Sequence, residues 1–260
     1  DNFGYNFSGF ALQTSGSLID VLENTVVSGS VVNLYFYETM GRGGNFQYFW
    51  NSNGKPPMWF ISGSPPAVPE WDTVYFNVNP SREKTDGYSR GTLENVMAVN
   101  CLYGDFDAKD GWTVEKVEKI IPSPSVIVSS GHGWHCYWLL KEPIIITEAN
   151  RDHICKTQEE WVKFTGADKN AKDLTRMLRV PCSFNNKDDE QIQVAYHVVD
   201  LGQLYELGTL EGYLTRGNTT VKQSPEQENQ TFTYDIANAF AYLQRLSSRR
   251  VDNYEEWLQV

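Results

Sequence analysis

The chain lacks several features that would place it in a well-known class at once. None of its apolar runs reaches about 18 residues, so the sequence predicts no transmembrane helix. The G-x-x-x-x-G-K-[ST] pattern of P-loop enzymes is absent, and residues 1–10 show neither the basic start nor the apolar stretch of a secretory signal. An excess of basic residues is also missing, because the net charge is −11. A general nucleic-acid binder usually carries a basic surface, so any nucleic-acid contact must come from a local patch, a bound metal or parts of the protein outside this sequence.

Cysteine is scarce and forms no C-x-x-C pair. The sequence contains four cysteines, at Cys101, Cys136, Cys155 and Cys182. Their wide spacing favours buried, reduced thiols in a cytoplasmic protein over a disulfide framework. A zinc site that uses His153 and Cys155 is the weaker alternative, because structural zinc normally shows paired ligand spacings.

Strand and helix patterns mix along the chain and predict one α/β (α+β) domain over residues 1–215. Runs of β-branched and aromatic residues predict strands at 31–37, 45–50, 73–78, 96–102, 126–128, 134–140 and 192–199. Apolar periodicity predicts helices at 17–23, 113–121 and 148–164, the last ending at Gly166.

A polar stretch separates this domain from the end of the chain. Residues 216–230 contain a single apolar side chain, Val221, and indicate a linker. Residues 231–260 indicate a helical segment that begins a second module. Because the chain starts with Asp1 and stops at Val260 within an expected helix, we expect it to be a fragment of a longer protein.

An Asp-x-Asp pair directly follows the apolar strand at 96–102. The strand period of two puts Asp105 and Asp107 on one face, while Phe106 points to the other. Two carboxylates so close together repel each other unless a cation such as Mg²⁺ or Mn²⁺ lies between them. A solvated turn is the alternative, but the position at the end of a buried strand favours a functional role.

The second notable segment is the glycine-rich turn Ser130-Gly131-His132-Gly133. Small residues allow backbone N–H groups to approach an anion closely. His135 lies on the strand that follows and could donate a hydrogen bond to a phosphate oxygen. The alternative is that each histidine is a structural residue of a hairpin.

The third segment combines one carboxylate with several cations. Asp173, Arg176 and Arg179 stand three residues apart, which predicts one side of a helical turn, and Lys187 follows in a loop. This combination fits a metal ligand beside groups that neutralise a triphosphate. A surface cluster of salt bridges is the alternative.

In this order, the three segments resemble the catalytic motifs of archaeo-eukaryotic primases, in particular the primase-polymerases of phages, plasmids and mobile elements. The likeness covers residues 74–199 and implies a catalytic core with an RRM-like sheet packed beside an N-terminal α/β unit, followed by a small helical appendage. It implies that Asp105, Asp107 and Asp173 bind two Mg²⁺ or Mn²⁺ ions. It assigns nucleotide binding to Ser130, Gly131, His132, His135, Arg176, Arg179 and Lys187.

The activity that this resemblance implies is template-directed transfer of (d)NTPs onto a 3′-OH, which synthesises and extends primers on single-stranded DNA. A helicase or further domains outside this sequence are the expected additional partners. Two alternatives stay open at this point. One is a metal-dependent nuclease or phosphohydrolase that uses the same carboxylates, and the other is a non-catalytic nucleic-acid-binding module of a replication protein.

Overall fold

The structure is a computed structural model that describes residues 36–51, 58–62, 73–85, 90–187 and 190–216. The expected helices at 17–23 and 231–260 lie outside the described residues, as does the expected linker at 216–230 apart from Arg216. Within the described ranges, no helix is both long enough and apolar enough to cross a membrane.

Two antiparallel sheets carry the architecture. The first sheet has the order β2-β1-β3-β7 and is built from β1 (Phe46–Asn51), β2 (Met58–Ile61), β3 (Val74–Asn77) and β7 (Met177–Arg179). The second sheet has the order β10-β5-β6-β4 and is built from β4 (Ala98–Asp107), β5 (Val126–Ser129), β6 (Gly133–Ile145) and β10 (Ala195–Val199). A small pair, β8 (Phe184–Asn185) and β9 (Ile192–Gln193), lies apart from both.

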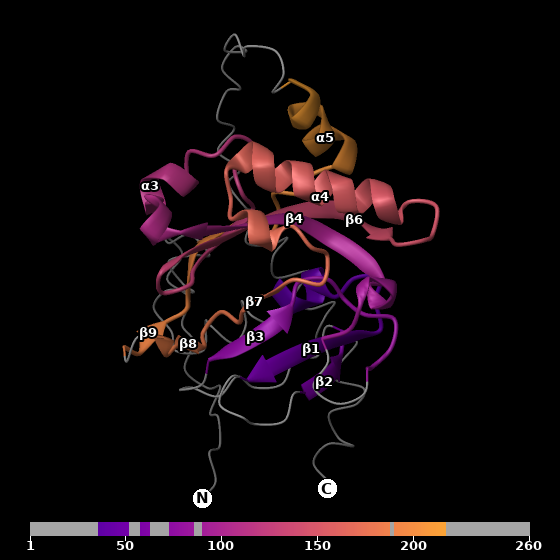
Figure 1. The fold of residues 1–260 in the computed structure, drawn as a ribbon, viewed down its shortest axis with the longest axis horizontal. Coiled ribbons are helices and arrows are strands. Elements are labelled where there is room, and N and C mark those ends of the chain that lie inside the picture. The colour runs from indigo at the N-terminus through magenta and orange to yellow at the C-terminus, as the bar shows by residue number, and fades with distance from the viewer. Residues whose placement is uncertain (1–35, 52–57, 63–72, 86–89, 188–189, 217–260) are drawn as a thin grey trace, which may run out of the picture. The chain divides into compact units, whose positions relative to one another are not determined.

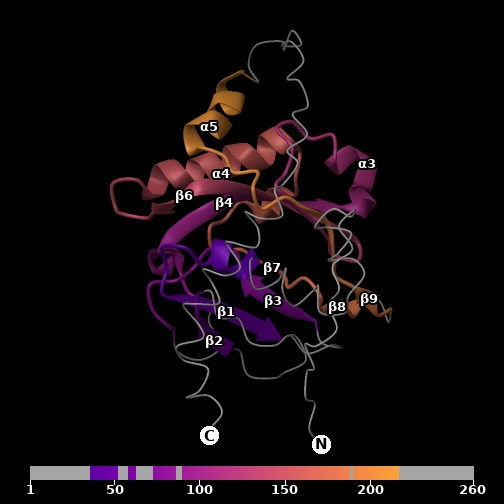
Figure 2. The same ribbon diagram turned by 180° about the vertical axis from the view of Figure 1, so that it is seen from behind.

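Helices cover one face of the second sheet, and the first sheet lies on the other side (Figures 1 and 2). The longer helices are α4 (Arg151–Thr165) and α5 (Leu207–Arg216), and the shorter ones are α3 (Val114–Val117) and the 3₁₀ turns η1 (Leu93–Asn95), η2 (Ala108–Asp110) and η3 (Lys169–Ala171). The ring of Trp161 on α4 meets the ring of Trp138 on β6 edge-on, with 5.1 Å between centroids. As the sequence predicts, α4 ends immediately before Gly166.

An aromatic core fills the space between the two sheets. Phe36 meets Tyr37, Phe76 and Tyr137 edge-on, at centroid distances of 5.3, 5.7 and 5.3 Å, and all four side chains are fully buried. Such pairs each contribute about 0.5–1.5 kcal/mol beyond the burial of their area. Phe76 comes from the first sheet, Tyr137 from the second, and Phe36 and Tyr37 from the helical residues 36–40, so these rings pack the two sheets together.

Three sequence predictions of local structure are wrong. Residues 36–40 are helical although a strand was expected through Tyr37, because Phe36, Tyr37 and Met40 present one buried face at helical spacing. Residues 177–179 form β7 and not a helical turn, because Leu178 pairs with Phe76 across the sheet. The strand expected at 192–199 is interrupted at Val194, whose backbone bonds to residues 182 and 183 instead.

Candidate active site

The acidic pair lies at the carboxyl end of β4. Phe106, between the two aspartates, is fully buried under the helices, so Asp105 and Asp107 face the opposite side, as the strand period predicts. The β4–β6 register places His135 directly opposite Asp105. Tyr103, two residues earlier on the same face, belongs to the core between the sheets. The acidic pair and His135 therefore lie where that core ends.

Arg176 reaches this point from the residue that precedes β7. Its Nη2 atom lies 3.3 Å from Oδ2 of Asp105, and its Nη1 atom donates to the carbonyl of Asn170 at 3.0 Å. The side chains of Arg176 and Asp105 are 22% and 18% exposed. Because the pair is partly shielded from bulk water, its electrostatic attraction is stronger than that of an exposed ion pair. The pair links the segment before β7 of the first sheet to β4 of the second sheet.

Asp105 lies in surroundings that disfavour its charge. Burial raises the pKa of Asp105, and repulsion from Asp107 and Asp168 raises it further, while Arg176 opposes both effects. Asp168 is held nearby because its backbone N–H donates to the carbonyl of Asp105 at 2.7 Å. A carboxylate in this position would be stabilised by an additional cation.

His135 is a buried and neutral histidine. Only 2% of its side chain is exposed, its Nε2 atom lies 3.8 Å from Oδ1 of Asp105, and its buried Nδ1 atom has no hydrogen-bond partner. Burial and the nearby Arg179 and Arg176 guanidinium groups lower the pKa of His135 to about 3. Since 3.8 Å exceeds hydrogen-bonding distance, the ring retains donor capacity for a ligand at neutral pH.

The glycines of the turn are required by close packing. A Cβ atom at Gly131, where φ is +94°, would lie 2.9 Å from Nδ2 of Asn185, and one at Gly133 would lie 2.2 Å from the carbonyl oxygen of Phe106. Asn185 also donates to the carbonyl of Ser130 at 2.9 Å. The turn therefore fits tightly between β8 and β4, which fixes the position of the strand that carries His135.

Two further predicted nucleotide-binding residues are His132, in the glycine-rich turn, and Lys187, which follows β8. The carbonyl of His132 accepts from the backbone N–H of Ala108 at 2.9 Å, so its backbone is tied to the residue after the acidic pair. Lys187 is exposed, its backbone N–H donates to Oδ1 of Asn185 at 3.2 Å, and within the described residues its side chain forms no ion pair. Among the described residues, no hydrogen bond or ion pair joins Lys187 to Asp105 or Asp107.

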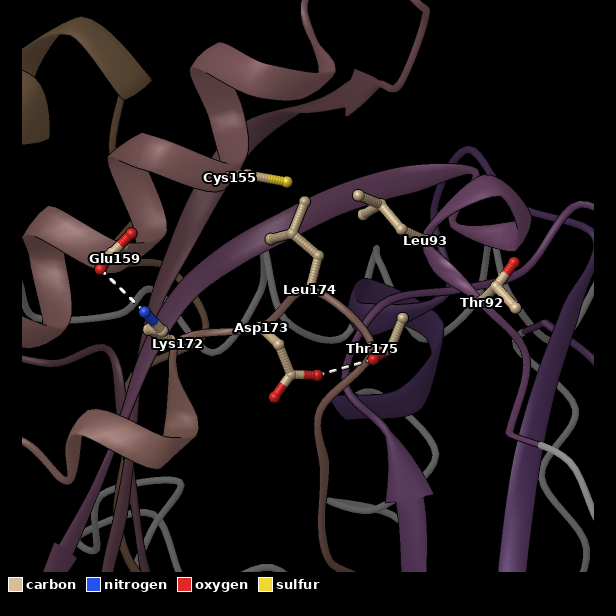
Figure 3. A pocket seen from close by; sticks show the side chains of 8 residues that line it. All are labelled: Thr92, Leu93, Cys155, Glu159, Lys172, Asp173, Leu174 and Thr175. Carbon is tan, nitrogen blue, oxygen red and sulfur yellow. Dashed lines mark hydrogen bonds and ion pairs between the residues drawn. The ribbon is translucent and has the colours of Figure 1, made fainter.

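Asp173 lies beside the site but turns its carboxylate to its own loop. Figure 3 shows this carboxylate directed toward Thr175 and away from Cys155, and Oγ1 of Thr175 donates to Oδ1 at 2.6 Å. The carbonyl of Asp173 accepts from the hydroxyl of Tyr103 at 2.5 Å, and Nη2 of Arg90 lies 4.0 Å from its carboxylate. Asp173 is thus anchored to the strand of the acidic pair through its backbone.

The side chains of the acidic pair suit a divalent ion that binds together with a phosphate group. Among the described residues, no group of three or more His, Cys, Asp or Glu side chains lies close enough together to hold a metal, so Asp173 is not assembled with Asp105 and Asp107. Mg²⁺ usually takes only one or two carboxylates and completes its shell with substrate phosphates and water. The destabilised charge of Asp105 beside Asp107 fits this requirement.

A groove beside Arg176 contains residues that sequence reasoning missed. It has a volume of about 470 Å³ and is lined by Tyr48, Trp50, Tyr75, Arg90, Arg176 and Met177. Asp168 was also missed, and its position in a loop after α4 gave no signal in the sequence. The aromatic residues lie in two strands that were predicted, but only the pairing of those strands brings the rings together.

No protein-family model matches the chain. Among solved structures, it is similar to the AEP domain of the primase-polymerase of cyanophage S-2L, with a TM-score of 0.51 and 16% identity over 71% of this chain and 97% of that domain. The chain has the fold of an archaeo-eukaryotic primase (AEP) catalytic domain. The AEP fold that the resemblance of the sequence motifs implies is thereby confirmed.

Two further similarities accompany the AEP fold. The catalytic domain of primase RepB′, in complex with initiator DNA, has a TM-score of 0.44 and 12% identity over 72% of this chain and 96% of that chain. A replication protein of Clostridium perfringens is 30% identical over 39% of this chain. The match spans only 28% of the length of that relative.

Proposed function

We propose that this AEP-fold chain is the catalytic domain of a DNA primase-polymerase, which transfers (d)NTPs onto a 3′-OH under the direction of a DNA template. One observation carries the proposal. The Asp105–Asp107 pair faces Arg176 and the neutral His135 at the end of the core between the two sheets. Carboxylates for a cation and donors for a phosphate thus lie within one site.

Asp105 and Asp107 would hold the divalent ions together with the nucleotide phosphates, and Asp173 would be the third carboxylate. When bound, two Mg²⁺ or Mn²⁺ ions would activate the attacking 3′-OH and stabilise the leaving pyrophosphate. The task of the protein is then mainly to position the reactants and neutralise their charge. Since its carboxylate now accepts from Thr175, Asp173 would have to turn toward the pair.

The nucleotide would be held by groups that surround the pair. His135 would donate one N–H to a phosphate oxygen, and Arg176 and Arg179 would neutralise the triphosphate. We assign supporting roles to Ser130, Gly131 and His132 in the turn and to Lys187 after β8. In this assignment the second sheet is the RRM-like catalytic sheet, and the first sheet belongs to the N-terminal unit.

The test is extension of a labelled primer on a DNA template in the presence of Mn²⁺ and dNTPs. We expect Asp105→Asn and Asp107→Asn to lower the rate at least on the order of 100-fold, because each removes a charged metal ligand. Asp110→Asn is the matched control, because Asp110 is an exposed aspartate in η2, just beyond the pair. Full extension by either site variant would refute the assignment.

The alternatives from the sequence give different results in companion assays. A nuclease would shorten labelled single-stranded DNA when metal is added without dNTPs. A non-catalytic binding module would retain DNA binding but show neither extension nor cleavage. A priming assay on unprimed single-stranded template, run with NTPs and with dNTPs, distinguishes synthesis of new primers from extension alone.

A further inference from the structure

Three side chains from adjacent strands of the first sheet form a ladder, here called the stacking ladder, which consists of Trp50, Tyr75 and Arg179. The register pairs Trp50 of β1 with Tyr75 of β3, and Tyr75 with Arg179 of β7. The rings of Trp50 and Tyr75 have centroids 5.4 Å apart, and the Arg179 guanidinium carbon lies 5.3 Å from the centre of the Tyr75 ring. The ladder therefore offers two aromatic rings and a cation in one row.

The ladder remains accessible to a ligand. Trp50 is 37% exposed, and Trp50 and Tyr75 both line the groove of about 470 Å³. Among the described residues, Arg179 forms no ion pair with a carboxylate, and its buried Nε atom has no hydrogen-bond partner. Charge and ring surface are thus available together.

The charges around the ladder point to a polyanion. The chain as a whole carries a net charge of −11, yet Arg90 and Arg176 line the same groove and Arg179 adjoins it. A ligand with both flat rings and negative charge matches this combination, as single-stranded nucleic acid does when its bases stack on aromatic side chains. Arg176 also contacts Asp105, so the groove and the proposed active site share this side chain.

We propose that the stacking ladder binds the single-stranded DNA template next to the active site. This inference rests on the proposed function, which requires a template at that place. Adjacent strands lie about 4.8 Å apart, so a ladder across three strands extends about 10 Å, which is more than the base of one incoming nucleotide needs. A strand that runs past the acidic pair would use this length.

The experiment measures binding of a fluorescent single-stranded oligo(dT) to the 260-residue chain by anisotropy, without divalent cation and at about 50 mM salt. We expect Trp50→Ala to weaken binding about 5- to 150-fold, the range for loss of one base-stacking partner. Trp50→Leu keeps apolar bulk without a ring and should weaken binding similarly, while Trp50→Phe should stay within about threefold of the wild type. Phe164→Ala is the matched control, because Phe164 is 38% exposed but lies on α4, on the far side of the second sheet.

Each outcome decides the inference. Equal affinity of Trp50→Leu and the wild type for oligo(dT) would overturn it, and so would a wild type that does not bind oligo(dT). Weaker dNTP binding by Trp50→Leu with unchanged oligo(dT) binding would assign the groove to the incoming nucleotide and also overturn it. Because no metal or catalysis is needed, a chain that binds oligo(dT) through Trp50 but never extends a primer would refute the proposed function, while binding of single-stranded DNA at the ladder would stand.

Discussion

Acidification should destabilise the folded chain through His135 in particular. A histidine in the unfolded chain has a pKa of about 6.5, whereas burial and the two neighbouring arginines lower the pKa of His135 to about 3. The folded state therefore resists protonation. The stability that depends on a neutral His135 is complete above pH 6.5 and is lost progressively as the pH falls toward 3.

The size of the effect at a given pH follows from how far that pH lies below the pKa of the unfolded histidine. A pH of 5 lies about 1.5 units below that pKa, while His135 in the folded chain is still neutral. Each unit corresponds to about 1.36 kcal/mol, so acidification from pH 7 to pH 5 should cost about 2 kcal/mol through this residue alone. The conversion is justified because His135 is almost completely removed from solvent.

Urea denaturation at pH 7 and at pH 5 measures this contribution. The His135→Gln variant cannot take up the proton, so it should lose about 2 kcal/mol less stability than the wild type between the two pH values. His153→Gln is the matched control, because His153 is 61% exposed on α4, and its pH response should stay within about 0.5 kcal/mol of the wild type. Equal losses in wild type and His135→Gln would show that His135 is not buried as a neutral group.

Two further changes test the site from other directions. Gly133→Ala should destabilise the chain by about 3 kcal/mol or more in urea denaturation, because the added Cβ would lie 2.2 Å from the carbonyl oxygen of Phe106. Gly208→Ala in α5 is the control, because it has open space around it and should be neutral or stabilising; equal effects of the two substitutions would refute the packing account. Arg176→Gln should shift the acid limb of the primer-extension pH profile to higher pH, because Arg176 lowers the pKa of Asp105. Lys163→Gln on α4 is the control and should leave the profile unchanged, whereas an unshifted acid limb in Arg176→Gln would contradict the electrostatic role of Arg176.

The sequence predicted elements that carry their own periodic signal. The run ending in Asp105 was identified because a long apolar strand precedes it, and α4 was identified because its apolar stripe recurs at helical spacing and stops at Gly166. By contrast, β7 has only three residues, too few to show a period, and it exists because it pairs with a strand about 100 residues earlier in the chain. Arg176 therefore precedes a strand, where the sequence predicted a helical turn.

The groove shows a second limit of sequence reasoning. Trp50 and Tyr75 were each assigned to a strand, but an alternating strand does not reveal which partner lies opposite. The ladder depends on two registers at once, and neither register is encoded by local spacing. Similarly, Arg90 belongs to none of the three sequence motifs, and only the tertiary fold brings it to the groove and within 4.0 Å of the Asp173 carboxylate.

The ion pair between Arg176 and Asp105 would couple the binding of a metal ion to the binding of a nucleotide. The guanidinium already neutralises a carboxylate that a cation would otherwise neutralise, and it cannot fully serve Asp105 and a phosphate at the same time. A cation at Asp105 would therefore release Arg176 for the phosphate. By thermodynamic reciprocity, each ligand would then raise the affinity for the other by the same factor. Such a site favours the metal–nucleotide complex over either component alone.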